Sequence, residues 1–150
     1  MIKNKPSYRD YMYVAIQLSL FVIYLLPVKI VSTHLPEWLR YSGLVLLCLG
    51  VILGAVALLQ LNTNLSPFPT PTSNGTLITT GAYRIARHPI YTALIFCGLG
   101  YAFYNQSSYK ALISITLLIL FYFKSKYEEK LLLKHFPEYR QYQQKTRRFL

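Results

Sequence analysis

The sequence predicts an all-α fold, a polytopic membrane helical bundle with about four transmembrane helices. Hydrophobic residues make up 53% of its 150 residues and charged residues only 14%. That balance is too poor in charge for a soluble surface of this size, but it suits a chain that turns apolar residues toward lipid. The net charge of +11 gathers at the ends of the apolar runs. This distribution indicates membrane lipids as partners and excludes nucleic acid.

The four spans are predicted from length, because about 20 helical residues cross the hydrocarbon layer. They cover roughly residues 11–30, 41–61, 89–104 and 109–123. The second segment is apolar on all sides, and the third opens with Pro89, a residue suited to a first helical turn. Only residues 105–108 join the last two spans, so we expect a helical hairpin there. We treat residues 1–150 as a single membrane-embedded domain.

Two segments are predicted to lie outside the membrane, on its cytosolic side. Residues 62–88 form a polar, proline-rich loop, and residues 124–150 form a tail that begins as an amphipathic helix. Lys110 and Lys124 flank the fourth span and are expected to snorkel to the headgroups. Of the 16 Lys and Arg residues, 13 share the side of the termini and the loop. The positive-inside rule therefore places both termini in the cytosol, at the inner membrane if the source is bacterial.

The stretch most suggestive of chemistry is residues 81–91, where two arginines, a histidine and two tyrosines precede an apolar helix. Pro89 lacks an amide donor and favours a helix start, which places His88 at the cap. The free amide groups of that first turn would suit the carboxylate or hydroxyl groups of a cofactor. On the residues alone, an interfacial anchor of basic and aromatic side chains is the alternative.

A second candidate element is the acidic pair Glu128 and Glu129, just after the last span. Adjacent helical residues point about 100° apart, so only one of the two is expected to face inward. An inward carboxylate beside Arg87 would stay ionised and bind an ammonium group or a ribose hydroxyl. The alternative is a solvated helix face paired with neighbouring lysines. Cys48 and Cys97 lack partners at ligand spacing, so no metal site is predicted.

These pieces together resemble the isoprenylcysteine carboxyl methyltransferase family and the related phospholipid N-methyltransferases. The resemblance runs from about residue 61 to residue 150, on Gly81-Ala82-Tyr83-Arg84, Arg87-His88-Pro89-Ile90-Tyr91, Gly98-Leu99-Gly100, Glu128-Glu129 and Phe136-Pro137-Glu138-Tyr139. Their order and spacing on a helical hairpin make it specific, whereas the first 60 residues match only as apolar spans. One departure is Ala93, where the family often has glycine; its methyl would narrow the pocket or face another helix.

The resemblance implies methyl transfer from S-adenosylmethionine to a hydrophobic, lipid-like or prenylated acceptor at the cytosolic membrane face, with S-adenosylhomocysteine as the product. The implied cofactor-binding residues are Tyr83, Arg87, His88, Pro89, Tyr91, Gly98, Gly100, Glu128 and Glu129. For the glycine pair, close helix packing is an equal alternative. The candidate catalytic residues are Arg87 and Arg140, which would hold a carboxylate acceptor, and Glu129, one of the candidate bases (with His88 and Glu128) for an amine acceptor.

Two other functions compete with this one. Sterol reductases have a similar tail with an Arg-His-Pro-like segment and use NADPH, but their chains are longer and richer in basic contacts for a dinucleotide. A non-enzymatic small membrane subunit is the other alternative. It would not require arginine, histidine and glutamate to converge on one membrane face.

Overall fold

The computed structural model describes residues 5–31, 34–72 and 75–150. Within them every regular element is helical, which confirms the all-α class. Lys3 is one of the 13 basic residues assigned above to the side of the termini, and it lies outside the described residues. The elements are α1 (Tyr8–Leu25), α2 (Glu37–Leu61), the 3-10 turn η1 (Asn62–Asn64), α3 (Ala82–Ile85), α4 (Pro89–Tyr104), α5 (Ser108–His135) and α6 (Tyr139–Lys145).

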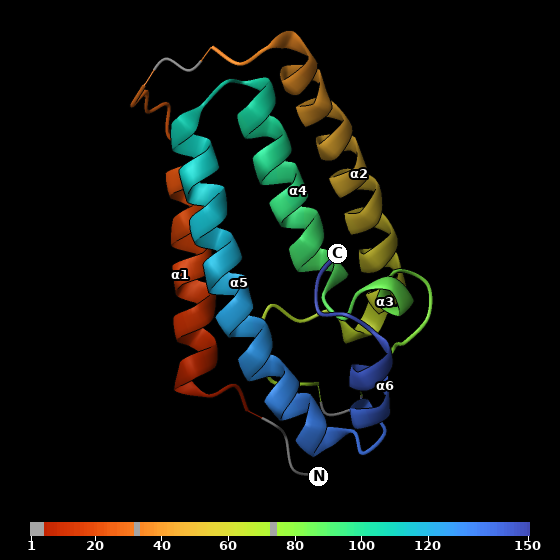
Figure 1. The fold of residues 1–150 in the computed structure, drawn as a ribbon. Coiled ribbons are helices and arrows are strands. Elements are labelled where there is room, and N and C mark those ends of the chain that lie inside the picture. Colours follow the sequence, from red (N-terminus) through yellow and green to blue (C-terminus); the bar gives the residue numbers. More distant parts are fainter. Residues whose placement is uncertain (1–4, 32–33, 73–74) are drawn as a thin grey trace.

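The four long helices run alternately up and down (Figure 1). α2 packs along α4, α4 packs against α5, and α1 packs against α5. The start of α1, the end of α2, the start of α4 and the end of α5 all lie at one end of the bundle, together with α3 and α6 (Figure 1). The close link between α4 and α5 forms the predicted hairpin. The side of the membrane on which the α3–α6 end lies stays a prediction.

The helices differ in how well they fit a membrane span. α2 and α5 are long and apolar enough to cross a membrane, and α4 is apolar but shorter. α1 begins at Tyr8, before the predicted start, and ends at Leu25. Its first turn therefore contains Arg9 and Asp10, which lower its hydropathy. The count of four spans, like the multi-pass topology, accordingly stays a prediction.

The predicted tail helix is the last part of α5, since this helix runs unbroken to His135. A surface position for that part stays a prediction. The expectation that Lys124 snorkels to the headgroups is wrong, because its side chain is only 2% exposed. Its ammonium group donates to Gln17 Oε1 at 2.7 Å and to the Pro67 carbonyl at 3.1 Å, inside the protein. A lysine within a helix can bury its charge when neighbouring elements supply polar partners.

Glycines explain the close packing of α2 on α4. A Cβ atom at Gly100 would lie 2.6 Å from the Gly43 carbonyl oxygen and 2.6 Å from the Leu47 amide nitrogen. Only glycine allows two backbones to approach this closely. The methyl of Ala93 lies 3.3 Å from the position of a Cβ at Gly54. It therefore faces α2, which was one of the two expectations for that residue.

Candidate active site

The segment that precedes α4 has the local structure expected from Pro89. His88 is the N-cap residue of α4, and Pro89 occupies the first helical turn. The extended residues before the helix pair with the C-terminal segment: Arg87 N–H donates to the Arg147 carbonyl at 2.8 Å, and His88 N–H to the Arg148 carbonyl at 3.1 Å. These two amides are therefore occupied by the chain itself. The role of the C-terminal segment was not predicted.

Tyr83 is positioned by the turn that starts α3. Gly81 has φ +61°, and a Cβ there would collide with the Gln60 side-chain amide. Gln60 Oε1 accepts a hydrogen bond from Ala82 N–H at 2.9 Å, which fixes α3 to the end of α2. The hydroxyl of Tyr142 on α6 donates to the Tyr83 carbonyl. Gly81 is thus required by both its backbone conformation and the close approach of α2.

Glu129 lies at the centre of a buried hydrogen-bond network. Its Oε1 accepts from Arg87 Nε at 2.9 Å and from Arg148 Nε at 3.1 Å. Its Oε2 accepts from Arg148 Nη2 at 2.8 Å and from Gln143 Nε2 at 3.0 Å. The hydrogen bonds to Glu129 raise the pKa of Arg148. His88 Nε2 lies 3.2 Å from Glu129 Oε1 and carries the proton, because an ionised carboxylate only accepts.

Arg87 takes part in this network through Nε and bonds two backbone carbonyls through Nη1. Besides Glu129, its guanidinium donates through Nη1 to the carbonyls of Gln143, at 2.9 Å, and Thr146. The side chain thereby ties the start of α4 to α5 and α6. A guanidinium with these partners stabilises the shape of the site.

Glu128 has the opposite environment, although it is the neighbour of Glu129. Its side chain is 25% exposed, against 3% for Glu129. Glu128 Oε2 accepts from the Tyr91 hydroxyl at 2.9 Å and lies 3.8 Å from His88 Nδ1. The Tyr91 ring is stacked between His88 and Phe121, with centroid distances of 5.3 and 4.6 Å. As expected from helical geometry, the two glutamates face different surroundings.

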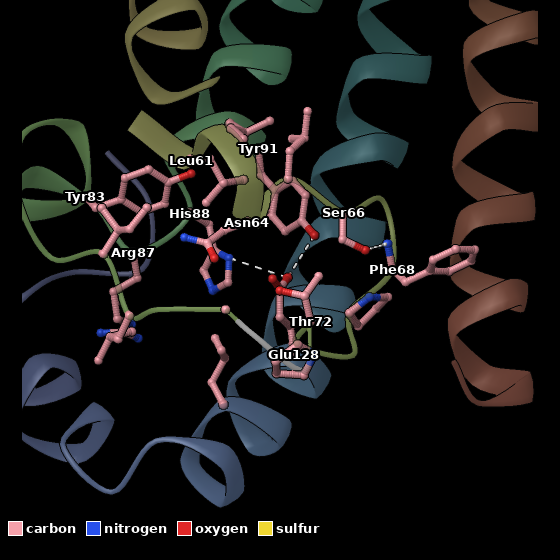
Figure 2. Close-up of a pocket in the computed structure, with 18 of the residues that line it drawn as sticks. Leu61, Asn64, Ser66, Phe68, Thr72, Tyr83, Arg87, His88, Tyr91 and Glu128 are labelled. Carbon is pink, nitrogen blue, oxygen red and sulfur yellow. Dashed lines mark hydrogen bonds and ion pairs between the residues drawn. The ribbon is translucent and has the colours of Figure 1, made fainter. Parts of the chain in front are cut away.

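These side chains surround a cavity of about 380 Å³ at the α3–α6 end of the bundle (Figure 2). Of the residues implied by the resemblance, six line it: Tyr83, Arg87, His88, Pro89, Tyr91 and Glu128. The other members are elsewhere. Glu129 lies behind the wall, and Gly100 packs against α2. A Cβ at Gly98 would lie 2.7 Å from Ser114 Oγ on α5, and Arg140 borders a separate recess.

A polar atom in the cavity wall lacks a partner. The side chain of Tyr139 on α6 is 1% exposed, and its hydroxyl makes no hydrogen bond within the described residues. Burial raises the pKa of Tyr139 and of Tyr83, so both hydroxyls remain protonated and can donate. A buried hydroxyl without a partner costs about 1–3 kcal/mol, which favours a ligand that accepts a hydrogen bond here.

The proline-rich loop forms one wall of the cavity, a role that the sequence did not predict. Pro67, Phe68 and Thr70 line the cavity. The Phe68 ring packs edge-on against Tyr11 of α1 at 5.1 Å, and the Thr70 hydroxyl donates to Asp10. The sequence predicts only a polar connection outside the membrane for this loop. The apolar residues among its prolines were the one available signal that it packs.

Within the described residues, the fold is a helical bundle with two helices long and apolar enough to cross a membrane and a cavity at one end. The family model described as phospholipid methyltransferase matches residues 38–139, and the chain belongs to this family of membrane methyltransferases. A comparison with curated protein sequences gives no match. The resemblance noted from the sequence is thus confirmed for the phospholipid methyltransferases.

A solved structure of the eukaryotic intramembrane Ras methyltransferase ICMT, an isoprenylcysteine carboxyl methyltransferase, has a similar fold, so the resemblance to that family is confirmed at the level of the fold. The TM-score is 0.69 at 21% sequence identity. The match covers 98% of this chain and 54% of the ICMT chain, so this chain spans about half the length of that protein.

Proposed function

We propose that the chain binds S-adenosylmethionine in the cavity and transfers its methyl group to a hydrophobic acceptor, lipid-like or prenylated, at the cytosolic membrane face. The observation that carries this proposal is a cavity lined by the Glu128 carboxylate, with the buried, unpartnered hydroxyl of Tyr139 in its wall. Family membership supports methyl transfer. The name of the ICMT structure, a Ras methyltransferase, supports a prenylated acceptor as one candidate.

The cavity residues fit such a cofactor. A volume of about 380 Å³ lies within the range of small-molecule sites. Glu128 has acceptor capacity for an ammonium or a hydroxyl group, and Tyr139 can donate to a carboxylate. The stacked rings of His88 and Tyr91 provide an aromatic wall. When bound, the cofactor supplies a methyl group already activated by a sulfonium.

The proposed binding residues are therefore Tyr83, His88, Pro89, Tyr91 and Glu128, with Tyr139 added by the structure. Arg87, which lines the cavity, and Glu129, which lies behind its wall, act as positioning residues, because they hold His88 and the start of α4. We do not include Gly98, Gly100 and Arg140, since they lie outside the cavity lining.

The protein's own contribution to methyl transfer is placement and exclusion of water. A displacement at an activated methyl needs little beyond aligned reactants in a dry site. A carboxylate acceptor would need no base. For an amine acceptor, Glu128 and His88 are the candidate bases, since both line the cavity while Glu129 is enclosed by its donors.

Calorimetric titration of the detergent-purified protein separates the three candidate functions. We expect binding of S-adenosylhomocysteine and none of NADPH. Binding of NADPH alone would establish a reductase-like site, and binding of neither ligand would favour a non-enzymatic subunit. Transfer of a radiolabelled methyl group to a membrane lipid extract then tests the activity, with heat-inactivated protein as the control.

A further inference from the structure

The proline-rich loop covers one side of the cavity with a continuous stretch of chain. Every residue from Leu65 to Thr72 lines the cavity. In Figure 2 the labelled loop residues Ser66, Phe68 and Thr72 lie on the side of the cavity away from Arg87. Positions 67, 69 and 71 of this stretch are all proline. Proline fixes its own backbone φ, so a stretch with proline at every second position is stiff and moves as a unit.

The backbone of this stretch is not tied into the helical bundle. Within the described residues, no backbone–backbone hydrogen bond joins residues 66–71 to another element. Where the loop leaves α2, Asn62 has φ +43°, a conformation that is uncommon for residues other than glycine. A stiff stretch that follows such a residue can swing about it, because the backbone there is already held away from its preferred conformations.

Three side-chain contacts fasten the stretch, and each joins it to α1 or α5: Thr70 to Asp10, Phe68 to Tyr11, and the Pro67 carbonyl to Lys124. Two of the three come from α1, which lies outside residues 38–139, the part of the chain that the family model matches. The position of this cavity wall therefore depends on a helix to which the family match assigns no role.

The two charged groups that fasten the stretch are incompletely compensated. Asp10 is 0% exposed, and its Oδ1 has no hydrogen-bond partner within the described residues. Lys124 bonds the neutral carbonyls of Gln17 and Pro67, and no carboxylate of the described chain lies within 4.0 Å of its ammonium. Burying such groups costs free energy, which water returns when the stretch lifts away. The fastened position is thus opposed by the hydration of Asp10 and Lys124, so it can be released.

We propose that residues 66–71 form a lid over the cavity, and that Asp10, Thr70 and Lys124 are the positioning residues that keep it fastened. With the lid lifted, a water-soluble ligand can enter or leave the cavity. With the lid fastened, water is excluded from the site, as methyl transfer requires. The inference goes beyond the proposed function, because it assigns ligand exchange to α1 and the loop. It rests on that function only for the identity of the ligand.

The first test measures the association and dissociation rate constants of S-adenosylhomocysteine in detergent. Thr70→Val keeps the shape of the side chain and removes its hydrogen bond to Asp10. Because a hydrogen bond to a carboxylate is lost, we expect both rate constants to rise about threefold or more. Phe68→Ala removes a separate contact of the lid and should raise both as well. The control is Thr116→Val, which removes an exposed hydroxyl bonded only to its own helix and should change neither rate constant.

Two results of this test would overturn the lid. Rate constants equal to those of the wild type in both variants would show that the contacts do not control entry. A higher dissociation rate constant with an unchanged association rate constant would make the stretch a static wall that only contacts the ligand. Thermal unfolding of each variant checks that the fold is retained.

The second test needs no cofactor. Leu94→Cys places a thiol in the cavity lining, in a background in which Cys48→Ser and Cys97→Ser remove the native thiols. A charged methanethiosulfonate reagent should label this thiol faster when Thr70→Val is added, and at an unchanged rate when Thr116→Val is added. Equal labelling rates would overturn the lid. Faster labelling in a protein that binds no S-adenosylhomocysteine would support the lid and refute the proposed function instead.

Discussion

Glu128 and Glu129 are neighbours on α5, yet they belong to two regions with opposite properties. Around Glu129, the guanidinium groups of Arg87 and Arg148 and the imidazole of His88 enclose the carboxylate. Around Glu128, the carboxylate has the Tyr91 hydroxyl as its hydrogen-bond partner and faces a cavity. The carboxylate of the first region has all its hydrogen-bond partners within the protein, and we call this the closed region. The second region faces the cavity, and we call it the open region.

The comparison shows how a cavity can be kept open in a small bundle. The Glu129 network joins α4, α5 and the C-terminal segment, so the wall does not depend on a bound ligand to hold its shape. Groups that must bind a ligand are then free to keep unused donors and acceptors, as Tyr139 does. Variants in the closed region should therefore change stability first, and variants in the open region should change affinity alone.

The largest effect is expected for Glu129→Ala. This change leaves Arg87 and His88 without their buried counter-charge, and removing one partner of a buried ion pair typically costs about 3–5 kcal/mol. We expect a clearly lower Tm in detergent, with loss of S-adenosylhomocysteine binding as a consequence. Glu128→Gln, which keeps an acceptor for the Tyr91 hydroxyl, is the control and should melt like the wild type. An unchanged Tm for Glu129→Ala would break the distinction between the two regions.

Glu128→Gln should have the next largest effect, and on affinity alone. The amide keeps an acceptor for Tyr91 but removes the negative charge that faces the cavity. A hydrogen bond to a charged group contributes about 1.5–3 kcal/mol, which corresponds to a tenfold or greater increase in the Kd of S-adenosylhomocysteine. Calorimetry measures the Kd and thermal unfolding checks the fold. A variant that binds normally would remove Glu128 from the proposed site.

The sequence predicted the local features of this arrangement well. Pro89 begins a helix, His88 caps it, and the short link after Tyr104 produces a hairpin, because each depends on a few adjacent residues. The motif between Gly81 and Tyr91 also correctly indicated where polar side chains gather. The order of the motifs was specific enough for the family resemblance that the comparisons confirm.

Features that depend on distant segments were not predictable. The rotation of α5, which decides that Glu128 and not Glu129 faces the cavity, is set by packing against α1 and α4. The pairing of residues 86–88 with the C-terminal segment joins residues about 60 positions apart. Burial of Lys124 likewise depends on Gln17, more than 100 residues away. None of these contacts leaves a periodic or local signal in the sequence.

The smallest and sharpest test of the comparison is Tyr139→Phe. The substitution removes a buried hydroxyl that has no partner in the described chain, so the protein itself loses no hydrogen bond. Stability should therefore stay the same or rise, by up to about 1 kcal/mol. Affinity for S-adenosylhomocysteine should fall several-fold if the hydroxyl donates to the ligand.

Tyr142→Phe is the control with the opposite outcome. The Tyr142 hydroxyl donates a hydrogen bond to the Tyr83 carbonyl, so its removal should lower the Tm. Equal stability losses in the two variants would mean that Tyr139 belongs to the closed region, and that the opening of the cavity toward α6 is not a binding surface.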